Sequence, residues 1–189
     1  RNLIRTPLYP YHVTTRTINK DWFDIPLSEV WQIALHCLKE ANKKHPVEIM
    51  SFVLMANHYH LLLKTPGSDL DSFMYEFNKN FANILLQRSI RISRVFGGRY
   101  KWCLIRSQTY LYNCYRYIYQ NPLRAGVVSE CEDYPYSTLH NLVHQKSLPF
   151  AIYDPFGFKD KYFLQKLNQD LTPIESESVK KGLSRSLLT

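Results

Sequence analysis

The chain has 189 residues, of which 45% are hydrophobic and 14% aromatic, and a formal net charge of +8. A chain of this length and apolar content folds as one domain, or as one domain with a tail, and is not intrinsically disordered. It has neither an apolar run near the ~18 residues of a membrane span nor a signal-peptide core at its start, so we expect a cytoplasmic protein that spans no membrane.

The first half of the chain alternates between strand and helix patterns. Residues 10–17 are β-branched and alternating, which predicts a strand, and apolar residues at helical spacing predict a helix over 27–44. Residues 47–55 and 58–65 predict two further strands. The short connection between them predicts a β-hairpin.

The pattern continues beyond the hairpin. Apolar residues at helical spacing predict a second helix over 69–89, and the glycines of FGG at 96–98 then interrupt the chain. Residues 99–105 predict a fourth strand, and 107–120 a third helix that ends before Pro122.

The resulting order is β-α-β-β-α-β-α. Its first six elements follow the split β-α-β plan, so we predict an α+β fold with a ferredoxin-like core, in which helices cover one face of an antiparallel sheet. We place this domain at residues 1–140. The weakly patterned, Pro-punctuated residues 141–189 are a C-terminal extension of uncertain structure.

The positive charge is concentrated in one segment. Residues 78–124 carry nine basic residues, six of the fourteen tyrosines and no acidic residue. The remaining residues hold 15 basic and 16 acidic side chains, so they carry almost no net charge. Cations neutralise phosphates while aromatic rings stack on unpaired bases, so this segment favours a single-stranded nucleic acid as partner. The plainer alternative is a solvated basic face.

The cysteines do not form a metal or redox motif. The chain has four, without CxxC spacing: Cys37, Cys103, Cys114 and Cys131. We therefore expect buried, reduced thiols.

Two histidines stand two residues apart in the third predicted strand. Residues i and i+2 of a strand share a face, so His58 and His60 point to one side and Tyr59 to the other. Two imidazoles on one face can converge on a divalent metal. An isolated His-x-His is a weak signal, so a third ligand and a reacting group are needed.

The third helix offers both. Its tyrosines are Tyr110, Tyr112, Tyr115, Tyr117 and Tyr119. Side chains at i and i+4 of a helix are neighbours, and of the last three tyrosines only Tyr117 has an amide there, Asn121. A phenol beside a metal-binding amide oxygen, facing two histidines, is a candidate nucleophile toward a phosphodiester.

At these residues the sequence resembles the HUH single-tyrosine transposases, and in particular their REP-associated tyrosine transposase branch, within the IS200-like transposases. The resemblance rests on MANHYHLLL and on RYIYQNPLRAGVV, with support from YHVTTR at 11–16, GRY at 98–100 and DYPYSTL at 133–139. It spans about residues 11–140 in the expected order. The classical members carry Gln where this chain has Asn121.

The resemblance implies a metal-dependent endonuclease and strand transferase that cleaves and rejoins single-stranded DNA beside a hairpin. It implies a covalent 5′-phosphotyrosine intermediate on Tyr117, with His58, His60 and Asn121 as ligands of Mg²⁺ or Mn²⁺ and no nucleotide cofactor. The implied partner is a REP-like palindromic hairpin, and this branch favours a monomer over a homodimer. As DNA-binding residues we expect Arg16, Arg91, Arg94, Arg99, Lys101, Arg106 and Arg124.

Two alternatives remain open. A non-catalytic binder of hairpin or single-stranded nucleic acid, including a transposase that has lost activity, would share the fold, the charge and the aromatic residues. A two-histidine phosphoesterase is suggested faintly by His12-Val13-Thr14, but the second motif carries His60 where that class needs a hydroxyl. A metalloprotease is excluded because the chain lacks HExxH.

Overall fold

The computed structural model of the chain describes residues 3–90, 93–157, 161–185 and 187–188. The predicted β-α-β-β-α-β order is confirmed. Its six elements are β1 (Tyr11–Arg16), α1 (Leu27–Lys44), β2 (Glu48–Leu54), β3 (His58–Lys64), α2 (Leu70–Arg88) and β4 (Lys101–Ile105). A short 3-10 turn, η1 (Ile18–Lys20), follows β1.

The strands form one sheet in the order β2-β3-β1-β4-β5. The first four are antiparallel, with Val13 of β1 opposite Leu61 of β3 and Trp102 of β4, which is the ferredoxin-like arrangement predicted from the sequence. A short fifth strand, β5 (Leu187–Leu188), lies parallel to β4 at the edge. The predicted α+β class is therefore confirmed.

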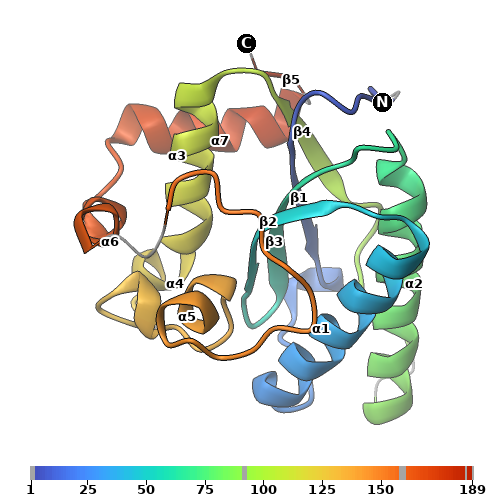
Figure 1. Cartoon of the computed structure of the whole chain (residues 1–189). Helices are drawn as coiled ribbons and strands as arrows, with labels where there is room; N and C mark the ends of the chain where they lie inside the picture. Colours follow the sequence, from blue (N-terminus) through green and yellow to red (C-terminus); the bar gives the residue numbers. More distant parts are fainter. Residues whose placement is uncertain (1–2, 91–92, 158–160, 186, 189) are drawn as a thin grey trace.

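One face of the sheet packs against α1 and α2 (Figure 1). Alternate residues of β1 and β3 point into this layer, among them Tyr11, Val13 and Tyr59, all fully buried. The Tyr59 hydroxyl donates a 2.6 Å hydrogen bond to Asn78 of α2 and accepts one of 2.8 Å from Thr15. The residue between the two histidines is thus a core residue with a satisfied hydroxyl.

A second layer of helices covers the opposite face (Figure 1). It consists of α3 (Gln108–Tyr119), α5 (Thr138–Val143) and the helices of the C-terminal segment, α6 (Lys161–Asn168) and α7 (Pro173–Arg185). The short α4 (Asn121–Arg124) follows α3, and η2 (Cys131–Asp133) precedes α5. The sheet therefore lies between two helical layers, and the second one adds to the single layer that the sequence predicted.

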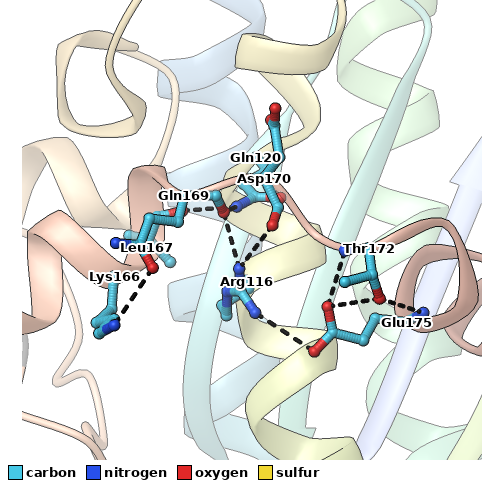
Figure 2. Close-up of polar contacts among 8 residues, drawn as sticks. All are labelled: Arg116, Gln120, Lys166, Leu167, Gln169, Asp170, Thr172 and Glu175. Atoms are coloured by element: carbon cyan, nitrogen blue, oxygen red, sulfur yellow. Dashed lines mark hydrogen bonds and ion pairs between the residues drawn. The ribbon is translucent and has the colours of Figure 1, made fainter.

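The C-terminal segment is tied to α3 by a buried arginine (Figure 2). The Arg116 guanidinium donates hydrogen bonds of 2.8 and 3.2 Å to the carbonyls of Gln169 and Asp170 and lies 3.6 Å from the Glu175 carboxylate. One helical turn on, the Gln120 amide donates a 2.6 Å bond to the same Gln169 carbonyl. These contacts hold the start of α7 against α3.

The four cysteines are buried, as the sequence predicted, and none of them is paired in a disulfide in this structure. Within the described ranges, no helix has both the length and the apolar content needed to cross a membrane.

Candidate active site

A cavity of about 630 Å³ opens on the second face of the sheet, where β1 ends and β3 begins. Its lining includes His58 and His60 from β3, Tyr117 from α3 and Asn121 from the start of α4. The structure therefore brings together the four residues that the sequence singled out. The Tyr117 ring lies edge-on to the His60 ring, and the two ring centroids are 5.8 Å apart.

His58 has one ring nitrogen fixed by its neighbour. Its Nδ1–H donates a 2.7 Å hydrogen bond to Oδ1 of Asn57, whose amide donates in turn to the Lys20 carbonyl at 2.7 Å. In the neutral ring this leaves Nε2 with a free lone pair. Burial, assisted by the charge of Arg16, lowers the pKa of His58 to about 4, so the ring is neutral at physiological pH.

His60 is held by a third histidine. Its Nδ1 lies 2.9 Å from Nε2 of His12 on the adjacent strand β1, and both side chains are buried. Burial lowers the pKa of His12 to about 3 and also lowers that of His60, so both rings are neutral. One nitrogen of this pair donates the proton and the other accepts it. The second ring nitrogen of His12, Nδ1, is buried and has no hydrogen-bond partner among the residues described.

The position of His12 in β1 is a sequence signal for its place in the site. His12 lies between Tyr11 and Val13 in β1, so its side chain points to the opposite face of the sheet from theirs. In a ferredoxin-like sheet, β1 pairs with the strand that carries His60. The alternation of β1 therefore places His12 on the histidine face. Only the pairing register shows that the two rings meet.

Tyr117 is nearly buried but faces the cavity. Burial raises the pKa of its phenol, while the positive charge of Arg124 opposes this rise. The Arg124 guanidinium carbon lies 4.8 Å from the centre of the Tyr117 ring. The arginine stacks on the ring and places a positive charge beside the phenol.

The neighbouring tyrosines of α3 are engaged elsewhere. The Tyr115 hydroxyl donates a 2.8 Å hydrogen bond to the Met50 carbonyl, and the Tyr119 hydroxyl lies 2.9 Å from that of Thr138. Both rings are buried in the core of the second layer. Tyr117 is the tyrosine of this helix that lines the cavity.

Asn121 is oriented by the helix that precedes it. Its amide nitrogen donates hydrogen bonds of 2.7 and 3.3 Å to the carbonyls of Tyr117 and Ile118. Because the nitrogen is used in this way, the group left for the cavity is the carbonyl oxygen. A carbonyl oxygen is a ligand that Mg²⁺ and Mn²⁺ accept.

Some of the predicted DNA-binding cations lie at the cavity and others lie away from it. Arg16, Arg99 and Lys101 line the cavity, together with Lys180 of α7, which the sequence did not single out. The extension that carries Lys180 had no pattern that linked it to the site.

Other predicted cations lie outside the cavity lining. Arg106 follows β4 at the opposite end of the sheet, where its guanidinium lies 5.8 Å from the Tyr9 ring centre. Arg94 is exposed on the segment between α2 and β4. Arg91 falls outside the residues that the structure describes.

The donors at the cavity fit a divalent cation. His58 supplies one imidazole lone pair, His60 can supply another, and Asn121 presents an amide oxygen. No carboxylate lines this cavity in the described part of the chain. Nor do the described residues contain a group of three or more His, Cys, Asp or Glu side chains arranged for a metal. A cation here would keep open positions for water or substrate.

Comparisons with known proteins show the family of the chain. Residues 7–121 match the family described as Transposase IS200 like. A REP-associated tyrosine transposase of Haemophilus influenzae is 28% identical over 128 residues, covering 59% of this chain and 69% of that protein. A REP-associated tyrosine transposase of Escherichia coli is 26% identical over 125 residues, covering 65% and 73%.

One solved structure has the same fold. It is a REP-associated tyrosine transposase bound to a REP hairpin, which superposes with a TM-score of 0.67 at 21% sequence identity. The superposition covers 82% of this chain and 91% of the other.

Proposed function

Because the chain belongs to the Transposase IS200 like family of DNA-processing enzymes, we propose that it cleaves and rejoins single-stranded DNA beside a hairpin, with Tyr117 as the nucleophile. The observation that carries this proposal is the position of Tyr117. It is the tyrosine of α3 that lines the cavity, beside His60, Asn121 and a stacked arginine.

The reaction transfers the phosphoryl group of the DNA strand from a 3′ oxygen to the Tyr117 hydroxyl oxygen. The Tyr117 hydroxyl oxygen attacks the phosphorus and the bond from phosphorus to the 3′ oxygen breaks, which leaves a 3′ hydroxyl and a 5′-phosphotyrosine. The phenol proton passes to water, and water supplies the proton that the departing 3′ oxygen takes up. No carboxylate lines the cavity in the described residues to serve as a base. A 3′ hydroxyl reverses the attack and rejoins the strand. The phosphodiester energy is conserved throughout, so no nucleotide cofactor is needed.

Arginines surround the reacting group. Arg124 lies against the Tyr117 ring and favours the phenolate, and Arg16 lies on the β1 side of the cavity, where it can neutralise the phosphate. Fixed cations of this kind stabilise negative charge as it develops, because they do not have to reorient during the reaction.

We propose His58, His60 and Asn121 as the ligands of a divalent cation, Mg²⁺ or Mn²⁺. When bound, such an ion supplies Lewis-acid polarisation of the phosphodiester. The protein contributes neutral imidazoles with one nitrogen fixed by hydrogen bonds, and an amide whose oxygen is directed by the helix.

We propose a hairpin as the DNA partner because the solved relative of the same fold is bound to a REP hairpin. Arg99, Lys101 and Lys180 would guide the flanking strand into the cavity, with Arg16 and Arg124 close to the phosphate. We place the nuclease domain at residues 1–140 and treat 141–189 as an extension that contributes Lys180. The protein acts as a monomer in this proposal.

A labelled panel of DNA hairpins with unpaired flanks tests the proposal, in Mg²⁺, Mn²⁺ or EDTA. We expect a metal-dependent, SDS-resistant protein–DNA adduct that Tyr117→Phe abolishes. Tyr112→Phe is the matched control, because it removes a tyrosine hydroxyl from the same helix, outside the cavity lining. Binding without an adduct on a diverse panel would instead favour a non-catalytic hairpin-binding protein. An adduct that survives in Tyr117→Phe would show that the nucleophile is wrong.

A further inference from the structure

A second chamber of about 330 Å³ lies next to the proposed catalytic cavity, on the side of α2. It is bounded by α2 and by the segment that leads into β4. Its walls are Met74, Tyr75, Phe96 and Tyr100, so the interior is largely aromatic and apolar. Tyr75 stands at its rim with 65% of its surface exposed. No function proposed so far uses this chamber.

The chamber contains polar groups whose hydrogen-bonding capacity is not fully used by the described residues. The Tyr100 hydroxyl is buried and has no hydrogen-bond partner among the described residues. Asn78 uses its oxygen to accept the hydrogen bond from Tyr59, which leaves its amide N–H groups for another acceptor. The charge of Asp71, the acidic residue of the lining, is neutralised by an ion pair with Arg5 at 2.6 Å.

The rim is positively charged. The Lys79 ammonium lies 5.5 Å from the centre of the Tyr75 ring, and the Arg99 guanidinium lies 5.9 Å from that of Tyr100. An apolar, aromatic interior with a cationic rim is complementary to a planar base attached to a phosphate chain. The same rim disfavours a cationic or purely apolar ligand.

The chamber adjoins the proposed catalytic cavity. Gly98 and Arg99 line both spaces. A β-carbon placed on Gly98 would meet no other atom within 4 Å, so no protein atom crowds the backbone at this shared residue. A strand that crosses the cavity can therefore place a neighbouring base in the chamber.

We propose that this chamber binds one unpaired nucleobase of the DNA strand whose phosphate lies in the catalytic cavity. The base stacks on Tyr75 and its edge reaches the Tyr100 hydroxyl and the Asn78 amide. This site would fix the register of the strand relative to Tyr117. The inference rests on the proposed function, since it assumes that single-stranded DNA enters the cavity.

Photo-crosslinking locates the base directly. The probes are a DNA hairpin with unpaired thymidine flanks on both sides, and an unstructured oligothymidine, each with 5-iodouracil at one position at a time. We expect one flank position to crosslink to Tyr75, Met74 or Tyr100, as identified by mass spectrometry of the peptides. A matched set with an abasic residue at each position measures the contribution of each base to affinity.

The chain offers a matched control for Tyr75. Tyr162 of α6 is also 65% exposed, and Lys166 lies 5.6 Å from its ring as Lys79 does from Tyr75. We expect Tyr75→Ala to weaken binding of the flanked hairpin about tenfold and Tyr162→Ala to leave it unchanged. The abasic probe at the crosslinked position should bind wild type and Tyr75→Ala equally.

A second variant removes only the unpartnered hydroxyl. Tyr100→Phe should fold at least as stably as wild type, because it deletes a buried polar group that lacks a partner. We expect it to reduce discrimination among bases at the crosslinked position. A folded Tyr100→Phe that discriminates among bases as wild type does, together with normal Tyr75→Ala binding, would overturn the inference.

The outcomes separate the two proposals. One outcome overturns the base site and leaves the proposed function intact: the hairpin binds normally and the Tyr117-dependent adduct forms, but nothing crosslinks to the chamber. In that case Tyr75→Ala and Tyr162→Ala also have equal effects. A crosslink in the chamber without any adduct supports the base site and argues against catalysis. Failure of every probe to bind overturns both.

Discussion

Nε2 of His12 lies 2.9 Å from Nδ1 of His60, and the two buried rings come from adjacent strands of the sheet. If His60 donates this hydrogen bond, its Nε2 has a free lone pair directed away from His12. His58 reaches the same state through its bond to Asn57. In that tautomer each candidate metal ligand has one ring nitrogen held by a hydrogen bond and the other free to bind an ion, as is usual for ligating histidines.

We therefore expect His12→Phe to weaken Mn²⁺ binding about 10- to 100-fold, because a ring without an acceptor no longer fixes His60. The measurement is Mn²⁺ titration calorimetry, with the Mn²⁺-dependent shift in melting temperature as a second readout. His12→Gln keeps an amide oxygen that can accept the bond and should retain part of the affinity. Equal Mn²⁺ affinity of His12→Phe and wild type would show that His12 does not position His60.

Arg124 is expected to act on the rate of adduct formation. Its guanidinium lies 4.8 Å from the Tyr117 ring centre and opposes the rise in the phenol pKa that burial causes. Removing this charge makes the phenolate less favourable, so Arg124→Gln should slow formation of the covalent adduct about 100-fold. The measurement is single-turnover adduct formation on a labelled hairpin.

Arg88→Gln is the control for that experiment, because Arg88 forms an exposed ion pair with Glu29 away from the cavity. It should react at the wild-type rate. An Arg124→Gln protein that also reacts at the wild-type rate would exclude a role for this cation in the reaction.

The predicted DNA-binding cations should differ in their effect on the salt dependence of DNA binding. Lys101 lines the cavity, whereas Arg106 lies at the other end of β4 over Tyr9. Each phosphate contact contributes about 0.7 to 0.9 to the slope of log affinity against log salt. We expect Lys101→Gln to reduce this slope by about one contact and Arg106→Gln to leave it unchanged, as measured by hairpin binding across a salt series. A larger effect of Arg106→Gln would place the strand on the opposite end of the sheet.

The ferredoxin-like core was predictable because its signals are local. Strand alternation, helical spacing and the FGG interruption each depend on a few neighbouring residues, and their order defines the topology. The same local reasoning placed Tyr117 and Asn121 on one side of the third helix, and both line the cavity.

Contacts distant in sequence were not predictable in the same way. The His12–His60 pair depends on strand register, and Lys180 reaches the cavity only because α7 packs against α3 and β4. One local signal in the extension was nevertheless readable. Thr172-Pro-Ile-Glu175 is a capping box, in which Glu175 accepts from Thr172 N–H at 2.8 Å and Thr172 Oγ1 accepts from Glu175 N–H at 3.2 Å. It predicts the start of α7.

Arg116 is a buried polar link between this extension and the tyrosine helix (Figure 2). It is 8% exposed, and its guanidinium binds the carbonyls of Gln169 and Asp170 and faces Glu175. Arg116→Met keeps the apolar stem but removes the donor to the Asp170 carbonyl and the positive charge beside Glu175, so we expect a loss of about 1–3 kcal/mol in the free energy of unfolding. Urea denaturation measures it.

Arg88→Met provides the matched comparison, because it breaks an exposed ion pair of 3.0 Å to Glu29 and should change stability by less than about 1 kcal/mol. The extension adjoins the cavity through Lys180, so loosening its attachment should also raise the protease sensitivity of residues 161–185 before global unfolding. If Arg116→Met were no less stable than Arg88→Met and its proteolysis unchanged, the extension would be held by the apolar contacts of α6 and α7 alone.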